Sequence, residues 1–203
     1  MNNIDAKLTI GLESPKGNIH LRCDLIIESG NDWKIKLSGP LGVDLALIEI
    51  HGERYTMKNL QLGETTEGYT DEVLFIPNFD VQLPPLKILA SMIIPYPNII
   101  YPQDWVITGS NLMANGDLKL SRSSQTGIDV RVLHLDYNPL RVHDEVITLK
   151  EATTLSRSFK YADSKSFLPN FVESKFGELV LKITYNALTI TKSTKSSFQL
   201  IPL

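Results

Sequence analysis

The sequence has little cysteine, no long apolar run and no strong excess of charge of one sign. Cys23 is the only cysteine among 203 residues, which excludes a disulfide within the chain. The net charge of −3, from 20 basic and 23 acidic residues, lacks the clustered basic surplus of nucleic-acid-binding proteins. No stretch approaches the roughly 20 apolar residues of a membrane-spanning helix. We therefore expect no nucleic-acid partner and no membrane-spanning helix.

Catalytic and metal-binding motifs are also lacking. The sequence contains no G-x-S-x-G, no H-E-x-x-H and no glycine-rich phosphate loop. Its four histidines do not have the close spacing of zinc ligands: they are His20, His51, His134 and His143. We expect no catalytic residue, no metal and no cofactor. Asp44 and Glu49 are the two carboxylates kept as candidates for acid–base chemistry, against the simpler interpretation that they solvate a strand face.

Apolar and polar residues alternate with a period of two through most of the chain, which predicts strands with one buried face. The clearest runs are residues 4–12, 19–28 and 33–37, joined by short turns of Gly, Pro, Ser and Asn. Residues 64–72 are polar and predict a loop. Further strands are expected at 43–47, 54–57, 105–109, 112–121, 127–137, 144–151, 157–162, 178–191 and 197–201. One-sided strands linked by short turns indicate an antiparallel sheet.

The middle of the chain predicts a short helix. Pro84 and Pro85 open the apolar run 86–94, and Pro95 closes it. Because apolar residues cover nearly its whole circumference, this helix should be buried on more than one side. A buried strand is the competing interpretation of the same run.

These elements predict one mainly β domain over residues 1–203. The expected architecture is an incomplete antiparallel β-barrel, which is a strongly curved sheet, with the short apolar helix as its lid. Such a sheet and helix would enclose a chamber lined by the inward side chains of the strands. The alternative is an ordinary sandwich or barrel whose interior is filled.

A second feature is the turn at residues 38–42, Ser-Gly-Pro-Leu-Gly. It places Leu41, a large apolar side chain, at the tip of a loop between two strands. Exposing a leucine forgoes about 1.5–3 kcal/mol of burial. Leu41 either folds back on the core or acts as a hydrophobic probe that touches lipid or a partner.

Residues 33–43, with the alternating strand after them and residues 52–56, resemble the outer-membrane lipoprotein receptor LolB and its relatives in the LolA/LolB lipoprotein localisation superfamily. The order of elements is similar too: a meander of strands, a lid helix and more strands. The motif covers about a quarter of the chain. The family's lipidated N-terminal cysteine is missing here, and only one lid helix is evident where the family has more helical cover.

The resemblance implies a non-catalytic protein that binds acyl chains of lipids or lipoproteins in an apolar cavity and transfers lipoproteins to the outer membrane. It implies a periplasmic carrier protein and the inner leaflet of the outer membrane as partners, and a lipid-anchored location on the periplasmic face of that membrane. By the Pro-Leu-Gly match, Leu41 corresponds to the leucine of the family's membrane-insertion loop. The implied cavity lining is Leu21, Cys23, Leu25, Trp33, Ile35, Leu37 and Leu45 from strands, with Leu86, Leu89 and Ile93 from the helix.

A rival hypothesis is a carbohydrate-binding or adhesion β-sandwich that uses Tyr96, Tyr101 and Trp105. Those aromatic side chains would then lie on an exposed flat face, without a central cavity. An enzyme is a third and weaker alternative, and it would require polar groups converging in a cleft.

Overall fold

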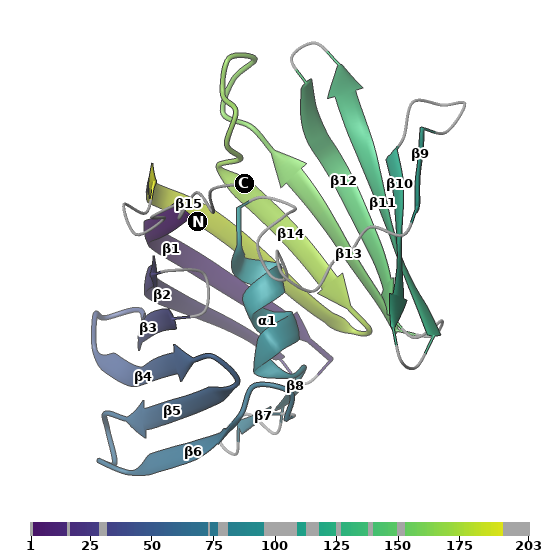
Figure 1. Cartoon of the computed structure of the whole chain (residues 1–203). Coiled ribbons are helices and arrows are strands. Elements are labelled where there is room, and N and C mark those ends of the chain that lie inside the picture. The colour runs from purple at the N-terminus through teal and green to yellow at the C-terminus, as the bar shows by residue number, and fades with distance from the viewer. Residues whose placement is uncertain are drawn as a thin grey trace, which may run out of the picture. The chain divides into compact units, whose positions relative to one another are not determined.

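The computed structural model describes residues 2–15, 17–28, 32–72, 74–76, 81–95, 109–112, 118–124, 127–137, 140–149 and 153–192. Within these ranges the chain is mainly β, with a single helix (Figure 1). The elements are β1 Asn2–Ser14, β2 Gly17–Glu28, β3 Asp32–Ser38, β4 Asp44–His51, β5 Arg54–Asn59, β6 Thr65–Tyr69, β7 Leu74–Ile76, β8 Val81–Leu83, α1 Leu86–Ile93, β9 Gly109–Leu112, β10 Leu118–Ser124, β11 Gly127–Tyr137, β12 Leu140–Leu149, β13 Thr153–Lys160, β14 Phe171–Phe176 and β15 Leu179–Lys192.

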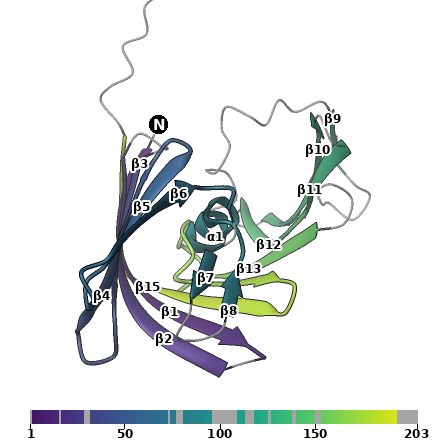
Figure 2. The same cartoon turned by 90° about the horizontal axis from the view of Figure 1, so that it is seen from below.

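Thirteen strands form one sheet in the order β6-β5-β4-β3-β2-β1-β15-β14-β13-β12-β11-β10-β9. Neighbours follow the chain except where β1 lies beside β15, as both views show (Figures 1 and 2). All described registers are antiparallel. The order starts at β6 and ends at β9, so the described strands do not close into a barrel. The predicted fold class, an open antiparallel β structure with one short apolar helix, is confirmed.

The chain divides into two compact units, which are described separately. Unit 1 comprises Met1–Leu8, Leu21–Thr70 and Asn186–Leu203, and unit 2 comprises Thr9–His20 and Asp71–Tyr185. Three long strands, β1, β2 and β15, contribute residues to both units because the boundaries fall inside them. That residues 1–203 behave as one domain stays a prediction.

In unit 1 the strands β2 to β5 have two unlike faces, as their alternation predicts. The backbone registers align the apolar positions into rows across the four strands. On the opposite face, charged side chains pair across strands, with Lys34 Nζ 3.6 Å from Glu49 Oε1 and Lys36 Nζ 2.8 Å from Asp44 Oδ2. This amphipathic pattern fixes the register, since a slip of one residue would turn every apolar side chain outward.

Unit 2 holds the helix, the separate β7–β8 hairpin and the strands from β9 to β14, together with part of β15. Its core positions on β13, β14 and β15 also line up across the sheet, as the described register shows. The buried apolar side chains of these strands are Leu155, Phe159, Val172, Leu179, Leu181, Ile183 and Tyr185. The helix α1 begins after Pro84 and Pro85 and ends before Pro95, as predicted.

Four of the described strands were not predicted. β6 lies within residues 64–72, where a loop was expected, and β7, β8 and β14 were missed altogether. β6 is the edge strand beside β5, and its side chains are polar and exposed on both faces, so it has no alternation to detect. Residues 105–108 of the strand expected at 105–109, and the whole strand expected at 197–201, lie outside the described residues.

The described part of the chain contains no helix of the length and apolarity needed to cross a membrane.

Candidate functional site

The apolar face of unit 1 is the first candidate site. It consists of one side of β2 to β5, where three parallel rows of apolar side chains run across the strands. The row farthest from the β3–β4 loop is Ile27, Trp33, Ile50 and Tyr55; the middle row is Leu25, Ile35, Ile48 and Met57; the row nearest that loop is Cys23, Leu37, Ala46 and, at its end, the polar Asn59. Below, "the apolar face" means these three rows.

Burial along the apolar face is graded. All four side chains of the row farthest from the β3–β4 loop are buried, and so are three of the four in the middle row. In the row nearest the loop, only Cys23 is buried, while Leu37 and Ala46 are half-buried. Leu21, one step farther along β2, is also half-buried. The apolar face is therefore most accessible at the end of the sheet where the β3–β4 loop lies.

Seven of the predicted cavity residues lie in unit 1. Buried positions of the apolar face hold Cys23, Leu25, Trp33 and Ile35, whereas Leu21 and Leu37 are half-buried. The predicted phase of β4 is displaced by one residue: a bulge opposite Leu37 and Ser38 makes Ala46, Ile48 and Ile50 the inward positions. Leu45 is the extra residue of that bulge, and it is half-buried beside Gly39.

The β3–β4 loop presents Leu41 to solvent, with 93% of its surface exposed. Two backbone hydrogen bonds close the loop: Gly39 N–H donates to Val43 O at 2.8 Å, and Gly42 N–H donates to Gly39 O at 3.0 Å. Gly42 has φ of +75°, a conformation that other residues adopt only with strain. Leu41 therefore does not fold back onto the core. Its role in membrane insertion stays a prediction.

The two carboxylates considered for acid–base chemistry both lie in ion pairs on the polar face. Hydrogen bonds from Lys36 and from Ser38 Oγ lower the pKa of Asp44, which keeps it ionised, and the bond to Asp44 raises the pKa of Lys36. Glu49 faces Lys34. Exposed ion pairs of this kind are typical of a solvated sheet surface.

The remaining predicted cavity residues lie on α1 in unit 2. Leu86 and Ile93 are buried, and Leu89 is half-buried. That these three side chains line a cavity with the strand residues stays a prediction.

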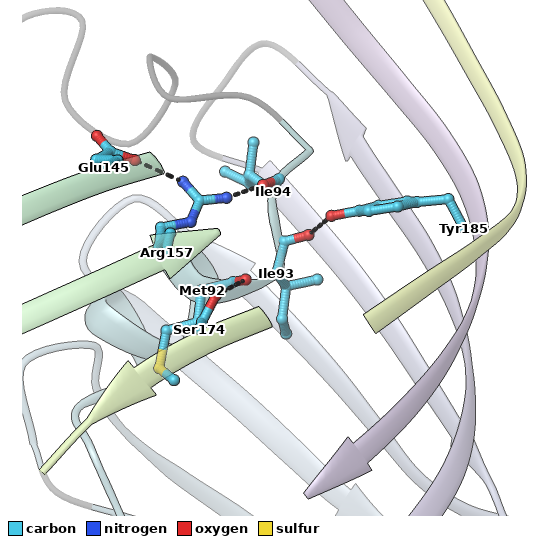
Figure 3. A network of polar contacts seen from close by, with 7 residues as sticks. All are labelled: Met92, Ile93, Ile94, Glu145, Arg157, Ser174 and Tyr185. Carbon is cyan, nitrogen blue, oxygen red and sulfur yellow. Dashed lines mark hydrogen bonds and ion pairs between the residues drawn. The ribbon is translucent and has the colours of Figure 1, made fainter. Parts of the chain in front are cut away.

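The C-terminal end of α1 is held by side chains from three adjacent strands (Figure 3). Ser174 Oγ of β14 donates a hydrogen bond to Met92 O at 2.9 Å, and Tyr185 Oη of β15 donates to Ile93 O. Arg157 Nη2 of β13 donates to Ile94 O. The last carbonyls of a helix lack partners within the helix, so these three donors satisfy groups that burial would otherwise penalise. The positive guanidinium also lies at the negative end of the helix dipole.

Arg157 is itself supported by a buried acid. Its Nη1 lies 3.2 Å from Oε2 of Glu145 on β12, and the two residues are 2% and 0% exposed. The guanidinium also stacks over the Phe159 ring, 4.8 Å from its centroid. Neither charged residue was predicted from the sequence. The available signal was Arg157 at an inward position between Leu155 and Phe159, where a charge requires a buried partner.

Other predicted features are less informative. Burial, and secondarily Asp24, raises the pKa of Cys23 to about 12, so its thiol stays neutral. No cluster of three or more His, Cys, Asp or Glu side chains suited to a metal lies within the described ranges. Tyr96, Tyr101 and Trp105, on which the carbohydrate hypothesis depends, lie outside the described residues.

Comparison of the structure with solved structures places this geometry in a known fold. A LolA superfamily protein from Nitrosomonas europaea aligns with a TM-score of 0.57 at 9% identity, covering 94% of this chain and 87% of that one. The chain shares the fold of that protein. A Vibrio parahaemolyticus domain assigned as an outer membrane lipoprotein-sorting protein aligns at 0.56 and 10% identity, covering 96% and 87%. A DUF1329 family protein from Desulfovibrio piger aligns at 0.53 and 8%, covering 92% and 84%.

No protein-family model and no curated protein sequence matches the chain. The resemblance to the LolA/LolB superfamily is thus supported at the level of the fold, which is shared over 92–96% of this chain at identities of 8–10%.

Proposed function

We propose that the protein binds acyl chains of a lipid or lipoprotein on the apolar face of unit 1 and delivers them to a membrane. The observation that carries this proposal is the graded burial of that face, which is least buried in the row nearest the β3–β4 loop. An acyl chain entering at Leu21 and Leu37 would extend an apolar surface that the sheet already provides. The fold shared with a LolA superfamily protein and with a domain assigned to outer membrane lipoprotein sorting supports the same assignment.

Hydrophobic transfer gives a mechanism without a chemical step. Each buried CH₂ contributes about 0.8 kcal/mol, so an acyl chain cannot leave a shielded site for water at a useful rate. A direct passage from one apolar surface to another keeps most of that burial and needs no nucleotide. On this proposal Leu41 enters the bilayer at release, the partners are a periplasmic carrier and the inner leaflet of the outer membrane, and the protein acts on the periplasmic face.

The first experiment measures binding of a fluorescent fatty acid to the purified protein in solution. We expect saturable binding, weakened about tenfold in Leu37→Gln, because a polar group would then face the acyl chain. Leu47→Gln is the matched control, since Leu47 is also half-buried but lies on the polar face beside Lys36 and Lys58. Equal affinity in both variants, with both folded by circular dichroism, would reject the apolar face as the site.

The second experiment tests delivery. Leu41→Glu should bind the fluorescent fatty acid with unchanged affinity, because Leu41 lies outside the apolar face. Its transfer of that probe to phospholipid vesicles should be at least about tenfold slower, since a leucine contributes about 1.5–3 kcal/mol when it enters an apolar phase. An unchanged transfer rate would remove Leu41 from the mechanism while leaving the binding proposal intact.

A further inference from the structure

A second apolar tip lies beside the β3–β4 loop. The β5–β6 turn, residues 59–64, carries Leu62 with 66% of its surface exposed and Leu60 with 36% exposed. Two hydrogen bonds tie it to the base of the first loop: Leu60 N–H donates to Leu45 O at 2.9 Å, and Gln61 Nε2 donates to Asp44 O at 2.7 Å. Both tips therefore lie at the same end of unit 1.

The backbone amides of the second tip are hydrogen-bonded within the protein, which is unusual for an exposed turn. The side-chain Oδ1 of Asn59 accepts hydrogen bonds from the amides of Gln61 and Leu62, at 2.9 and 3.1 Å. Asn59 N–H donates to Glu64 O, and Gly63 N–H donates to Asn59 O, both at 2.8 Å. With the bond from Leu60, every amide from 59 to 63 has a partner within the protein. An apolar environment penalises unpaired amides, so this turn can enter one at little cost.

The outermost residues of both tips carry no charge. Residues 39–43 and 59–63 contain no Asp, Glu, Lys or Arg, and Glu64 follows at the end of the second turn, where β6 begins. The charged groups at the base of the first loop, Lys36 and Asp44, are paired with each other at 2.8 Å. Neither tip would have to strip water from a charged group on leaving the aqueous phase.

We propose that these two tips, carrying Leu41 and Val43 on one and Leu60 and Leu62 on the other, form a bilayer-docking edge. The occupant is the lipid surface, because four partly exposed aliphatic side chains fall far short of the about 800 Å² that each partner buries in a standard protein interface. Two uncharged, hydrogen-bonded protrusions suit shallow insertion between lipid headgroups. The proposal rests on the proposed delivery function, and it adds Leu60, Leu62 and Asn59 to the single leucine predicted from sequence.

Vesicle flotation of the full chain tests the edge. We expect Leu62→Glu to bind phosphatidylcholine vesicles about tenfold more weakly than the unchanged protein. Binding should persist at high salt, because residues 39–43 and 59–63 carry no charge for salt to screen. Ile26→Glu is the matched control: Ile26 is an exposed aliphatic residue of unit 1, and it lies on the polar face opposite Lys34. Wild-type binding by Leu62→Glu, or an equal loss in Ile26→Glu, would overturn the proposal.

A polarity-sensitive dye gives a direct readout of insertion. The natural Cys23 is buried and its pKa is raised to about 12, so a thiol reagent at neutral pH should label Leu62→Cys at position 62 alone. We expect the dye emission to shift to the blue on vesicle addition, and the same dye at Ile26→Cys not to shift. Asn59→Ala should weaken docking several-fold with Leu62 intact, because it leaves two amides without an acceptor. An unshifted dye at saturating lipid would reject the bilayer and point to a protein as the occupant.

Failure of this edge is distinguishable from failure of the proposed function. Fatty-acid binding is measured without vesicles, and docking is measured without fatty acid. Fatty-acid binding with vesicle docking that does not depend on Leu62 would reject the second tip alone. Docking that depends on Leu62, without any fatty-acid binding, would leave the edge standing and reject acyl-chain binding.

Discussion

At the scale of single residues, burial determines the chemistry of Cys23. The thiol is buried in the apolar face, and its pKa is raised to about 12 by desolvation and by Asp24. Only the thiolate reacts with alkylating reagents, so we expect iodoacetamide to leave the folded protein unmodified at neutral pH and to add one group in denaturant. Mass spectrometry of both samples measures this. Alkylation of the native protein at a rate typical of an exposed thiol would contradict the buried position.

Some single residues could be predicted and others could not. The alternation around Leu25, Trp33 and Ile35 predicted buried positions, because the period of two is a local property of each strand. Leu45 was placed one step out of phase, because a bulge is set by the pairing of two strands and leaves no mark in either one. The Leu41 tip could be found because Gly and Pro mark the turn that displays it.

At the scale of elements, α1 shows which features of a site are determined by residues nearby in the chain. Its bounds follow from Pro84, Pro85 and Pro95, which stand beside it in the chain. The three side chains that hold its end are 63, 82 and 92 residues away from the carbonyls they bind. Such partners depend on the strand order, which periodicity does not reveal. The helix was therefore predictable, whereas its attachment to β13, β14 and β15 was not.

The attachment of α1 should dominate its stability. Arg157→Met removes the donor to Ile94 O and leaves Glu145 buried without its cation, which costs about 3–5 kcal/mol in free energy of unfolding. The double variant Glu145→Leu/Arg157→Met should lose less than Arg157→Met alone, because no charge remains buried. Urea unfolding followed by circular dichroism measures both. Ser174→Ala serves as the smaller comparison, with an expected loss of about 1–3 kcal/mol for the carbonyl of Met92. If the double variant has a lower free energy of unfolding than Arg157→Met, the loss of Arg157 does not destabilise the buried acid.

At the scale of the whole molecule, the sheet order carries the strongest constraint. The alternating strands and short turns predicted a meander, and the strand order does follow the chain from β1 to β6 and from β15 back to β9. The pairing of β1 with β15 joins strands from opposite ends of the chain, and no local pattern encodes it. Three strands, β1, β2 and β15, each have residues in both compact units.

Shared strands predict a single unfolding transition. A strand whose halves belong to different units cannot lose its ladder hydrogen bonds in one unit without weakening the other, so the units should unfold together. Ile183→Ala in unit 2 should lower the free energy of unfolding by about 2–5 kcal/mol. Hydrogen exchange with mass spectrometry would then show equal acceleration for peptides from β4, in unit 1, and from β13, in unit 2. Leu25→Ala, a buried position of unit 1, is the reciprocal variant and should give the same equality. If each variant accelerates exchange only in its own unit, residues 1–203 unfold as two domains, and acyl-chain binding would then be sought in unit 1 by itself.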